Sequence, residues 1–189
     1  MEAEYQGAII ENEPEIVERA KTDDAAFAIL YNHYFPKIYG YIFKRVGHKE
    51  TTEDLVSATF IKVFSNLKNY QYQNCSFGAW IYRIATNNLI DYYRKQGRKK
   101  EVNIDNIEEM ASLDTSPEEV AKLAENRQTV KLVMARLPQR QAEVINLKFF
   151  AELSNIEIAA TLGISVNNAG VLIHRAIKQF DNFYKKYGQ

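Results

Sequence analysis

Apolar residues recur with the spacing of amphipathic α-helices from residue 25 to near the end of this chain. The first such stretch, residues 25–47, predicts a helix that begins at a cap around Asp23 and ends at Gly47. Pro36 lies inside this stretch and predicts a kink or an interruption. We find no internal repeat and no convincing strand pattern. The chain is therefore predicted to be all-α.

Residues 51–67 predict the next helix. Thr51 or Thr52 is its expected cap. Glu53 and Asp54 then fall in the first turn, where the helix dipole favours acidic side chains. The apolar side of this helix consists of Leu55, Val56, Phe60, Val63, Phe64 and Leu67.

A third helix is predicted over residues 77–95, with Ser76 as its cap and Trp80 in the core. Its polar face mixes bases with amides at Arg83, Asn87, Asn88 and Arg94. The loop before it contains Tyr70, Tyr72, Gln73 and Asn74. Aromatic and amide side chains beside bases are suited to unstacked nucleotides, through stacking and edge hydrogen bonds. We expect these loop residues to be exposed; the alternative is that the tyrosines fill a core.

Residues 153–175 predict a helix, a tight turn and a second helix. Ser154 and Glu157 match a capping box, and Gly163 tolerates the positive φ of a sharp turn. Ser165 can cap the second helix. The inner face of that helix consists of Ala169 and Ile173. This pattern is typical of a helix-turn-helix, whose second helix can enter a DNA major groove, although an ordinary helical hairpin is the alternative.

The composition excludes several classes of protein. The chain has 189 residues and one cysteine, so no internal disulfide can form. Its three scattered histidines have no metal-ligand spacing, and we find no nucleotide-binding loop or catalytic motif. No apolar run approaches the roughly 18 residues of a membrane span, and the N-terminus has no signal-peptide pattern. We therefore expect a cytoplasmic protein that is not an enzyme, holds no cofactor or metal and is not inserted in a membrane.

Charge is distributed unevenly along the chain, although the net charge is zero. Residues 25–100 carry twelve bases and four acids, and residues 127–189 carry nine bases and four acids. The first 24 residues carry eight acids and two bases, and residues 101–126 carry eight acids and one base. Two basic modules are suited to a polyanion, and acidic segments can occupy basic grooves when it is absent. The alternative is that the charge segregates by chance between solvated faces.

These patterns predict four parts of the chain. Residues 1–22 are an acidic arm, and residues 23–100 form the first helical module. Residues 101–116 are an acidic linker, and residues 117–189 form the second module with the helix-turn-helix. The linker, about sixteen residues long, can span roughly 50 Å at 3.3 Å per residue.

Four segments carry a resemblance to a known family. They are DDAAFAILYNHYFPKIYGYIFKRVG, TTEDLVSATFIKVF, FGAWIYRIATNNLIDYYRK and RLPQRQAEVINLKFFAELSNIEIAATLGISVNNAGVLIHRA. In order and spacing they resemble bacterial sigma factors of the extracytoplasmic-function type, which retain only sigma regions 2 and 4. The resemblance covers about residues 20 to 180. It implies a sigma factor that directs RNA polymerase core to specific promoters and aids promoter opening.

The resemblance also implies which residues act. The polymerase core would be bound by Glu53, Asp54, Leu55, Val56 and Phe60. The −10 promoter element would be bound by Tyr70, Tyr72, Gln73, Asn74, Arg83, Asn87, Asn88 and Arg94. The −35 element would be bound by Ser154, Ser165, Asn167, Asn168, Val171, His174 and Arg175. The implied partners are RNA polymerase core, promoter DNA and an anti-sigma factor.

The chain departs from the family pattern at several positions. Ser57 and Ala58 stand where the family usually has a glutamine and an acid. Ala169, Gly170 and Leu172 stand where it commonly has valine, lysine and arginine. These departures predict a divergent −35 interaction. They also keep open one alternative, a sigma-like decoy that binds a regulator rather than a promoter. A stand-alone helix-turn-helix regulator, which would use only the second module, is a further alternative.

Overall fold

The computed structural model of the chain describes residues 10, 12–72, 75–96 and 117–187, with the side chains of all of these except 117–124. Within those residues the structure consists of α-helices, one short 3₁₀ helix and connecting turns, without a strand. The predicted all-α fold is confirmed.

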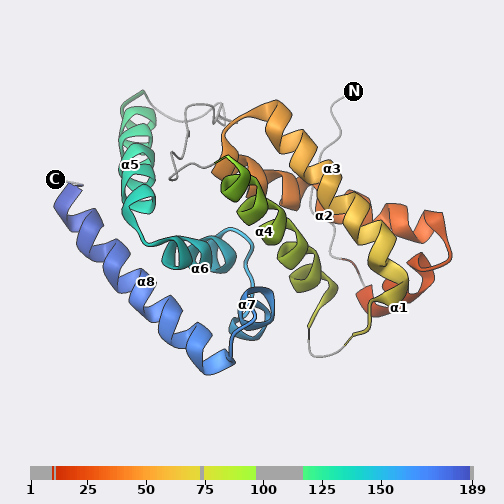
Figure 1. Cartoon of the computed structure of the whole chain (residues 1–189). Helices are drawn as coiled ribbons and strands as arrows, with labels where there is room; N and C mark the ends of the chain where they lie inside the picture. The colour runs from red at the N-terminus through yellow and green to blue at the C-terminus, as the bar shows by residue number, and fades with distance from the viewer. Residues whose placement is uncertain (1–9, 11, 73–74, 97–116, 188–189) are drawn as a thin grey trace.

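The helices fall into two groups in Figure 1. The first group is α1 (Glu13–Ala20), α2 (Asp24–Val46), α3 (Lys49–Asn66), the 3₁₀ turn η1 (Leu67–Asn69) and α4 (Phe77–Lys95). The second group is α5 (Pro117–Arg136), α6 (Gln139–Phe149), α7 (Asn155–Leu162) and α8 (Val166–Tyr187). Helix α4 lies in the middle of the molecule, where it packs against α2 and α3 on one side and against α7 on the other.

Helix α2 begins and ends as its sequence predicts. The Asp23 side chain accepts a hydrogen bond from the Ala25 N–H at 2.9 Å, and Gly47 ends the helix with φ of 67°. Of the kink or interruption predicted at Pro36, the interruption is wrong, because α2 continues through it. Tyr34 and Ile38, on either side of the proline, are both buried. Their burial offsets the backbone hydrogen bond that proline cannot donate.

Helix α3 begins one turn earlier than its sequence predicts. Its cap is His48, whose ring accepts from the Thr51 N–H, and not Thr51 or Thr52. Thr52 is buried inside the helix, and its hydroxyl donates to the His48 carbonyl at 2.9 Å. A threonine bonded four residues back is satisfied within a helix and has no need of a capping position. Glu53 therefore lies beyond the first turn, in which Glu50 is the acidic residue.

The core of the first group is formed by apolar side chains of α2, α3 and α4. Its completely buried members include Ile38, Ile42, Val63, Phe77 and Ile81. Helices α2 and α4 come close together at Gly78, where an added Cβ would lie 3.0 Å from the Tyr34 hydroxyl. The cluster of buried side chains continues into the second group through α7 and α6. The two groups therefore share one continuous core in this arrangement.

The second group builds the predicted helix-turn-helix from α7 and α8. Ser154 and Glu157 form both halves of the capping box, and Gly163 has φ of 65°. The Ser165 hydroxyl accepts from the Asn168 N–H at 3.2 Å and so caps α8. Among the described helices, no single one is long and apolar enough to cross a membrane; α7 and α8 pass that test only when joined across their 101° bend.

The two glycines of the helix-turn-helix provide matched substitutions. Gly163→Ala should lower the free energy of unfolding by about 1 kcal/mol, because a Cβ disfavours the positive φ. Gly170→Ala should raise it by about 0.5–1 kcal/mol, because Gly170 lies inside α8 with open space around it. Denaturant unfolding of both variants measures the two signs. Equal effects of the two substitutions would contradict the assigned backbone geometry.

Candidate nucleic-acid and polymerase interfaces

Helix α4 exposes one stripe along its length that is polar except at Ile90. Ser76 starts the helix by accepting from the Ala79 N–H at 3.1 Å. The exposed positions that follow are spaced by four, three and four residues, which places them on one face of a helix. They are Arg83, Asn87, Ile90 and Arg94. Arg94 also pairs with Asp91 at 3.1 Å in the last turn. Three of the predicted −10 residues therefore share an accessible face.

Asn88 does not belong to that face, so its prediction as part of an exposed polar surface is wrong. It is 5% exposed. Its amide donates to the Thr59 hydroxyl at 2.9 Å, and its carbonyl oxygen accepts from Lys62. Both partners lie on α3. Because a buried amide must satisfy its hydrogen bonds, Asn88 joins α4 to α3 instead of facing DNA.

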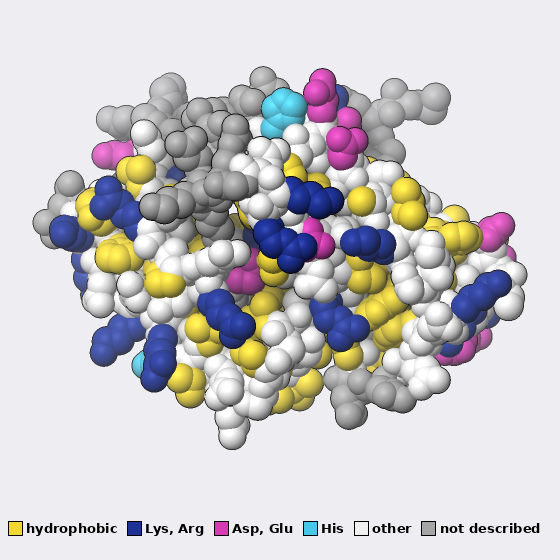
Figure 2. Space-filling view, in the orientation of Figure 1, with side chains coloured by type: hydrophobic (Ala, Val, Ile, Leu, Met, Phe, Trp, Pro, Cys, Tyr) yellow, Lys and Arg dark blue, Asp and Glu magenta, His cyan; other side chains and the backbone are white. Residues whose placement is uncertain are grey.

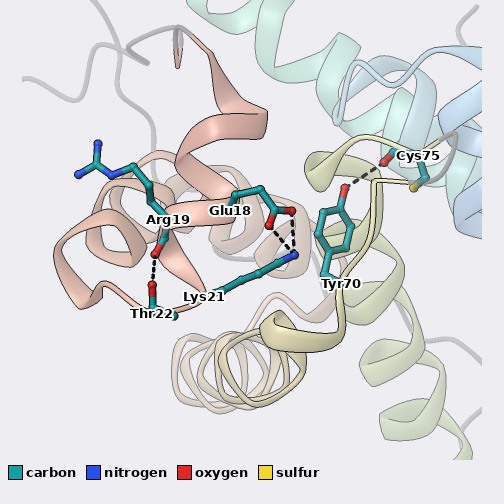
Figure 3. A network of polar contacts seen from close by, with 6 residues as sticks. All are labelled: Glu18, Arg19, Lys21, Thr22, Tyr70 and Cys75. Atoms are coloured by element: carbon teal, nitrogen blue, oxygen red, sulfur yellow. Dashed lines mark hydrogen bonds and ion pairs between the residues drawn. The ribbon is translucent and has the colours of Figure 1, made fainter.

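The two tyrosines before α4 differ in exposure. Tyr72 is 61% exposed, as predicted, whereas Tyr70 is 6% exposed. The Tyr70 ring lies 4.8 Å from Trp80 between ring centroids and 5.7 Å from Phe77, and its hydroxyl donates to the Cys75 carbonyl at 3.0 Å (Figure 3). Burial raises the pKa of that hydroxyl above its ordinary value. The predicted exposure of Tyr70 is therefore wrong, and it anchors the segment before α4.

Three further predictions concern Trp80 of α4 and two residues of the loop before it, Gln73 and Asn74. Trp80 is buried, as predicted. Gln73 and Asn74 lie outside the described residues. Figure 3 also shows the ion pair between Glu18 of α1 and Lys21, the residue that follows this helix. In this view the pair lies next to Tyr70.

Helix α8 exposes the face predicted to contact the −35 element. Ala169, Ile173 and Ala176 are buried at helical spacing and fix the rotation of the helix. The exposed residues of the opposite face are Asn167, Asn168, Val171, His174 and Arg175. Lys178, also exposed, extends this face by a further turn and was missed as a candidate, although it stands three residues after Arg175.

The family departures in α8 fall beside this face, not on it. Gly170 and Leu172 are half-buried, and Ala169 is completely buried. At positions 170 and 172 the chain therefore lacks the family's lysine and arginine. The amide and basic residues of the outward face are still present.

An open apolar groove of about 390 Å³ lies between α2 and α3. Among the predicted polymerase-binding residues, Glu53, Val56 and Phe60 line it, whereas Asp54 and Leu55 do not. Val56 and Phe60 are buried and form its floor. Exposed apolar side chains at its edge include Ile61 and Phe64.

The wall of the groove on α2 is a series of aromatic residues that the sequence reasoning missed. Phe27, Tyr31, Phe35 and Tyr39 recur at intervals of four. Phe27 contacts Phe64 edge to face with centroids 5.0 Å apart, and Tyr31 lies 4.6 Å from Phe60. The interval of four was visible in the sequence. What it could not show was that this stripe meets α3 and remains partly uncovered.

Basic side chains spread across the face of the molecule shown in Figure 2, with few acids among them. The charge segregation of the sequence therefore has a counterpart on the surface. A face of this kind attracts polyanions through its summed potential.

Glu157 belongs to both the helix-turn-helix and the start of α4. Its carboxylate accepts from the Ser154 N–H at 2.9 Å and from the Ser154 hydroxyl at 2.8 Å. It also accepts from the hydroxyl of Ser76, the cap of α4. Burial acts to raise the pKa of Glu157, but the bonds from Ser76 and Ser154 outweigh it and hold the pKa below its ordinary value of 4.5.

Comparison with known proteins identifies the two helical groups. Sigma-70 region 2 matches residues 30–99, and Sigma-70 region 4 matches residues 127–180. The ECF RNA polymerase sigma factor SigW of Bacillus subtilis is 32% identical over 165 residues, covering 82% of this chain and 87% of SigW. BldN of Streptomyces coelicolor, also an ECF sigma factor, is 33% identical over 165 residues, which cover 87% of this chain and 62% of BldN. The chain thus spans less than two thirds of BldN.

Two solved structures share the fold. CnrH, in complex with the cytosolic domain of CnrY, has a TM-score of 0.68 at 21% identity and covers 93% of this chain and 99% of CnrH. The sigma factor RpoE of Bartonella quintana, in complex with the anti-sigma factor NepR, has a TM-score of 0.61 at 19% identity and covers 84% of this chain and 96% of RpoE.

The fold, the helix-turn-helix and the two matched regions define a transcription initiation factor, a class of protein that acts through binding. The chain belongs to the extracytoplasmic-function family of RNA polymerase sigma factors.

The lowered pKa of Glu157 predicts an acid-sensitive contribution to stability. Because the pKa is lower in the folded state, the stabilisation is fully present above pH 4.5 and is lost as the pH falls through the folded-state value. Glu157→Gln keeps the capping-box geometry but removes the titrating group. The wild type should be the more stable protein at pH 7, and the difference should shrink as the pH falls below 4.5. Thermal unfolding across this pH range measures it, and a constant difference would contradict the assignment.

Proposed function

We propose that the chain brings RNA polymerase core to promoters by binding two DNA elements and the polymerase through three separate surfaces. The observation that carries this proposal is the combination of two exposed polar helix faces, on α4 and α8, with an apolar groove on α2 and α3. A stand-alone regulator would use α8 alone and would leave the α4 face and the groove without a role. Because polymerase and promoters are cytoplasmic in bacteria, we place the protein there.

At the −10 element, α4 and the segment before it would bind the opened strand. Tyr72 offers an exposed ring on which a base can stack, and Arg83 and Asn87, about one turn apart on α4, offer charge and hydrogen bonds. A base that leaves the duplex loses a few kcal/mol of stacking and pairing, which such contacts can offset. We retain Gln73 and Asn74 as candidates by their place in the sequence. Strand opening in this scheme needs binding energy and no chemical step.

At the −35 element, α8 would enter the major groove. An asparagine side chain can bind adenine through two hydrogen bonds, and an arginine can bind guanine or a phosphate. Asn168 is suited to a base contact, since the cap of α8 uses its backbone N–H and leaves the side chain available. Ser154 and Ser165 start α7 and α8, respectively, and their hydroxyls also serve as helix caps.

The groove between α2 and α3 is suited to polymerase. Its floor and walls are mainly aromatic, its edge carries Ile61 and Phe64, and Glu53 supplies one acidic rim residue. Apolar centres with a charged rim are typical of protein interfaces and not of nucleic-acid sites. Ser57 also lines it, so the family departure at this position leaves the groove less polar.

An anti-sigma factor is the third partner of the proposal. The solved complexes of CnrH and RpoE contain CnrY and the anti-sigma factor NepR, respectively. This chain has the same fold, which supports a partner of the same kind without naming it. The proposed division of the chain at residues 101–116 allows the two modules to separate when DNA or a partner binds.

The −35 surface predicts two different effects of substitution. Asn168→Ala should lower the affinity for the preferred −35 element by about 1–3 kcal/mol and relax one position of that element. If Arg175 contacts a phosphate, Arg175→Ala should weaken binding to all −35 elements alike. It should also reduce the slope of log affinity against log salt concentration by about one. Binding of the holoenzyme to −35 variants at several salt concentrations measures both.

The control is Lys185→Ala, an exposed base far along α8 that is paired with Asp181. It should change neither affinity nor preference. If Asn168→Ala and Arg175→Ala behave like this control, α8 is not the recognition helix, and the decoy alternative is favoured.

The groove predicts a polymerase-binding residue. Ile61→Asp should reduce the affinity for core polymerase at least tenfold, which corresponds to about 1.4 kcal/mol, because it puts a charge at an apolar edge. Ile29→Asp is the matched control, since Ile29 is an exposed isoleucine of α2 that does not line the groove. Fluorescence anisotropy with labelled sigma factor measures both affinities. Equal affinities of the two variants would place the polymerase elsewhere.

A further inference from the structure

A lysine of α3 is held against α4 by the buried amide of Asn88. The Lys62 Nζ donates to the Asn88 carbonyl oxygen, and the Asn88 amide nitrogen donates to the Thr59 hydroxyl at 2.9 Å. The Thr59 hydroxyl in turn donates to the Leu55 carbonyl at 2.7 Å within α3. Asn88 and Thr59 are buried, whereas Lys62 is exposed. A buried chain of hydrogen bonds therefore fixes the end of an exposed basic side chain.

The positive charge of Lys62 has no acidic partner among the described residues. The acidic residue of α4 closest to Asn88 in the sequence is Asp91, which pairs with Arg94 at 3.1 Å. An ammonium group has three donors, and Asn88 accepts from one of them. Two donors and a full positive charge therefore remain available at the surface.

Lys62 lies beside the exposed stripe of α4. Helices α3 and α4 pack against one another, and Asn87 of the stripe directly precedes Asn88. Arg83 stands about one turn earlier on the same stripe. Basic and amide side chains from two helices thus border one surface, and a nucleic-acid strand that follows the stripe passes the Lys62 ammonium.

We propose that Lys62 binds a backbone phosphate of the −10 strand, and that Asn88 is the positioning residue that holds Lys62 for this contact. The inference rests on the proposed function, because it adds a contact to the −10 surface of α4. A lysine ammonium acts on phosphate as a point charge, whereas the edges of bases are read by arginine forks and side-chain amides. Phosphate contacts fix the register of a strand and carry no sequence information. Lys62 would therefore position the strand, and Tyr72 and Asn87 would read its bases.

The bond to Asn88 prepares the lysine for this contact. A lysine that is free in solvent loses side-chain entropy when a phosphate immobilises it. Because Asn88 restricts Lys62 before DNA arrives, less entropy is lost on binding. The acceptor is a neutral amide, so it orients the ammonium without cancelling its charge. A carboxylate in the same place would do both.

Lys62→Met tests the phosphate contact, because methionine is nearly as long as lysine and carries no charge. Holoenzymes with wild-type and variant chains are titrated with promoter DNA that the wild type transcribes, at several salt concentrations. The variant should reduce the slope of log affinity against log salt concentration by about one. The advantage of the wild type should therefore fall by about threefold between about 50 and 200 mM salt.

Lys49→Met is the matched control. Lys49 is an exposed lysine at the start of α3, about 20 Å from Lys62 along the helix. Its replacement should leave the slope unchanged. A slope in Lys62→Met equal to that of this control overturns the proposal.

Neutral methylphosphonate linkages locate the phosphate. Placed one at a time through the −10 strand, each removes a single negative charge from the DNA. At one position the linkage should weaken binding by the wild type and have no further effect on Lys62→Met. Affinity for core polymerase should be equal in the two proteins. If every linkage weakens both proteins equally, or if Lys62→Met loses core affinity instead, Lys62 does not bind the strand.

Asn88→Ala separates positioning from a purely structural role. The variant leaves Thr59 bonded to Leu55 and keeps the Lys62 charge. It should therefore lower the DNA affinity by roughly two- to tenfold and leave the salt slope unchanged. Combined with Lys62→Met it should have no further effect, because no ammonium remains to be held. Equal losses with and without Lys62 would make Asn88 a structural residue only and overturn its positioning role.

Failure of the proposed function is recognised separately. If wild-type holoenzyme directs no promoter-specific transcription, the proposed function is rejected. Binding of the free, full-length chain to mixed-sequence single-stranded DNA then decides the role of Lys62. A smaller salt slope in Lys62→Met than in the wild type supports the phosphate contact, and equal slopes overturn it.

Discussion

The burial of α4 is the constraint on which the rest of the structure depends. This helix contacts α1, α2 and α3 with one side and α7 with another. Ile81, Ala85 and Leu89 are buried at intervals of four, and this spacing fixes the rotation of the helix. Arg83 and Asn87 can face outward only because that rotation is fixed. The stability of the first group and the position of the −10 surface therefore have a single physical cause.

The same constraint divides the polar residues of α4 and its preceding segment between two roles. Asn88 and Tyr70 resemble binding residues by type, yet each is buried with its hydrogen bonds satisfied. Removing the hydrogen-bond partner of either residue would leave a buried polar group unpaired, which lowers the free energy of unfolding by about 1–3 kcal/mol. Tyr72, only two residues from Tyr70, has no such contact with the core and is available to a nucleotide.

Acidic residues of the second group are placed where they contact the first. Residues 127–189 contain four acids, and two of them, Glu143 and Glu157, accept hydrogen bonds from residues of α2 and from the cap of α4. These acids are thus neutralised internally, while the basic side chains remain on the surface (Figure 2). These two acids also hold the two helical groups together.

The sequence by itself determined the local structure, because caps and helical spacing act over a few residues. Asp23, Ser76, the capping box at Ser154, and the positive φ of Gly163 all follow from side chains within one turn. The outward face of α8 was likewise predictable from Ala169 and Ile173.

Only the tertiary structure decided which similar residues were buried, where α3 began and what covered α4. Tyr70 and Tyr72 differ in what lies beside them, and Thr52 is buried inside a helix and does not cap one. The pairing of Arg45 with Glu143 joins residues 98 positions apart, and no periodic pattern in a sequence records such a contact. Local spacing encodes helices and their faces, whereas contacts between helices depend on how all the faces pack at once.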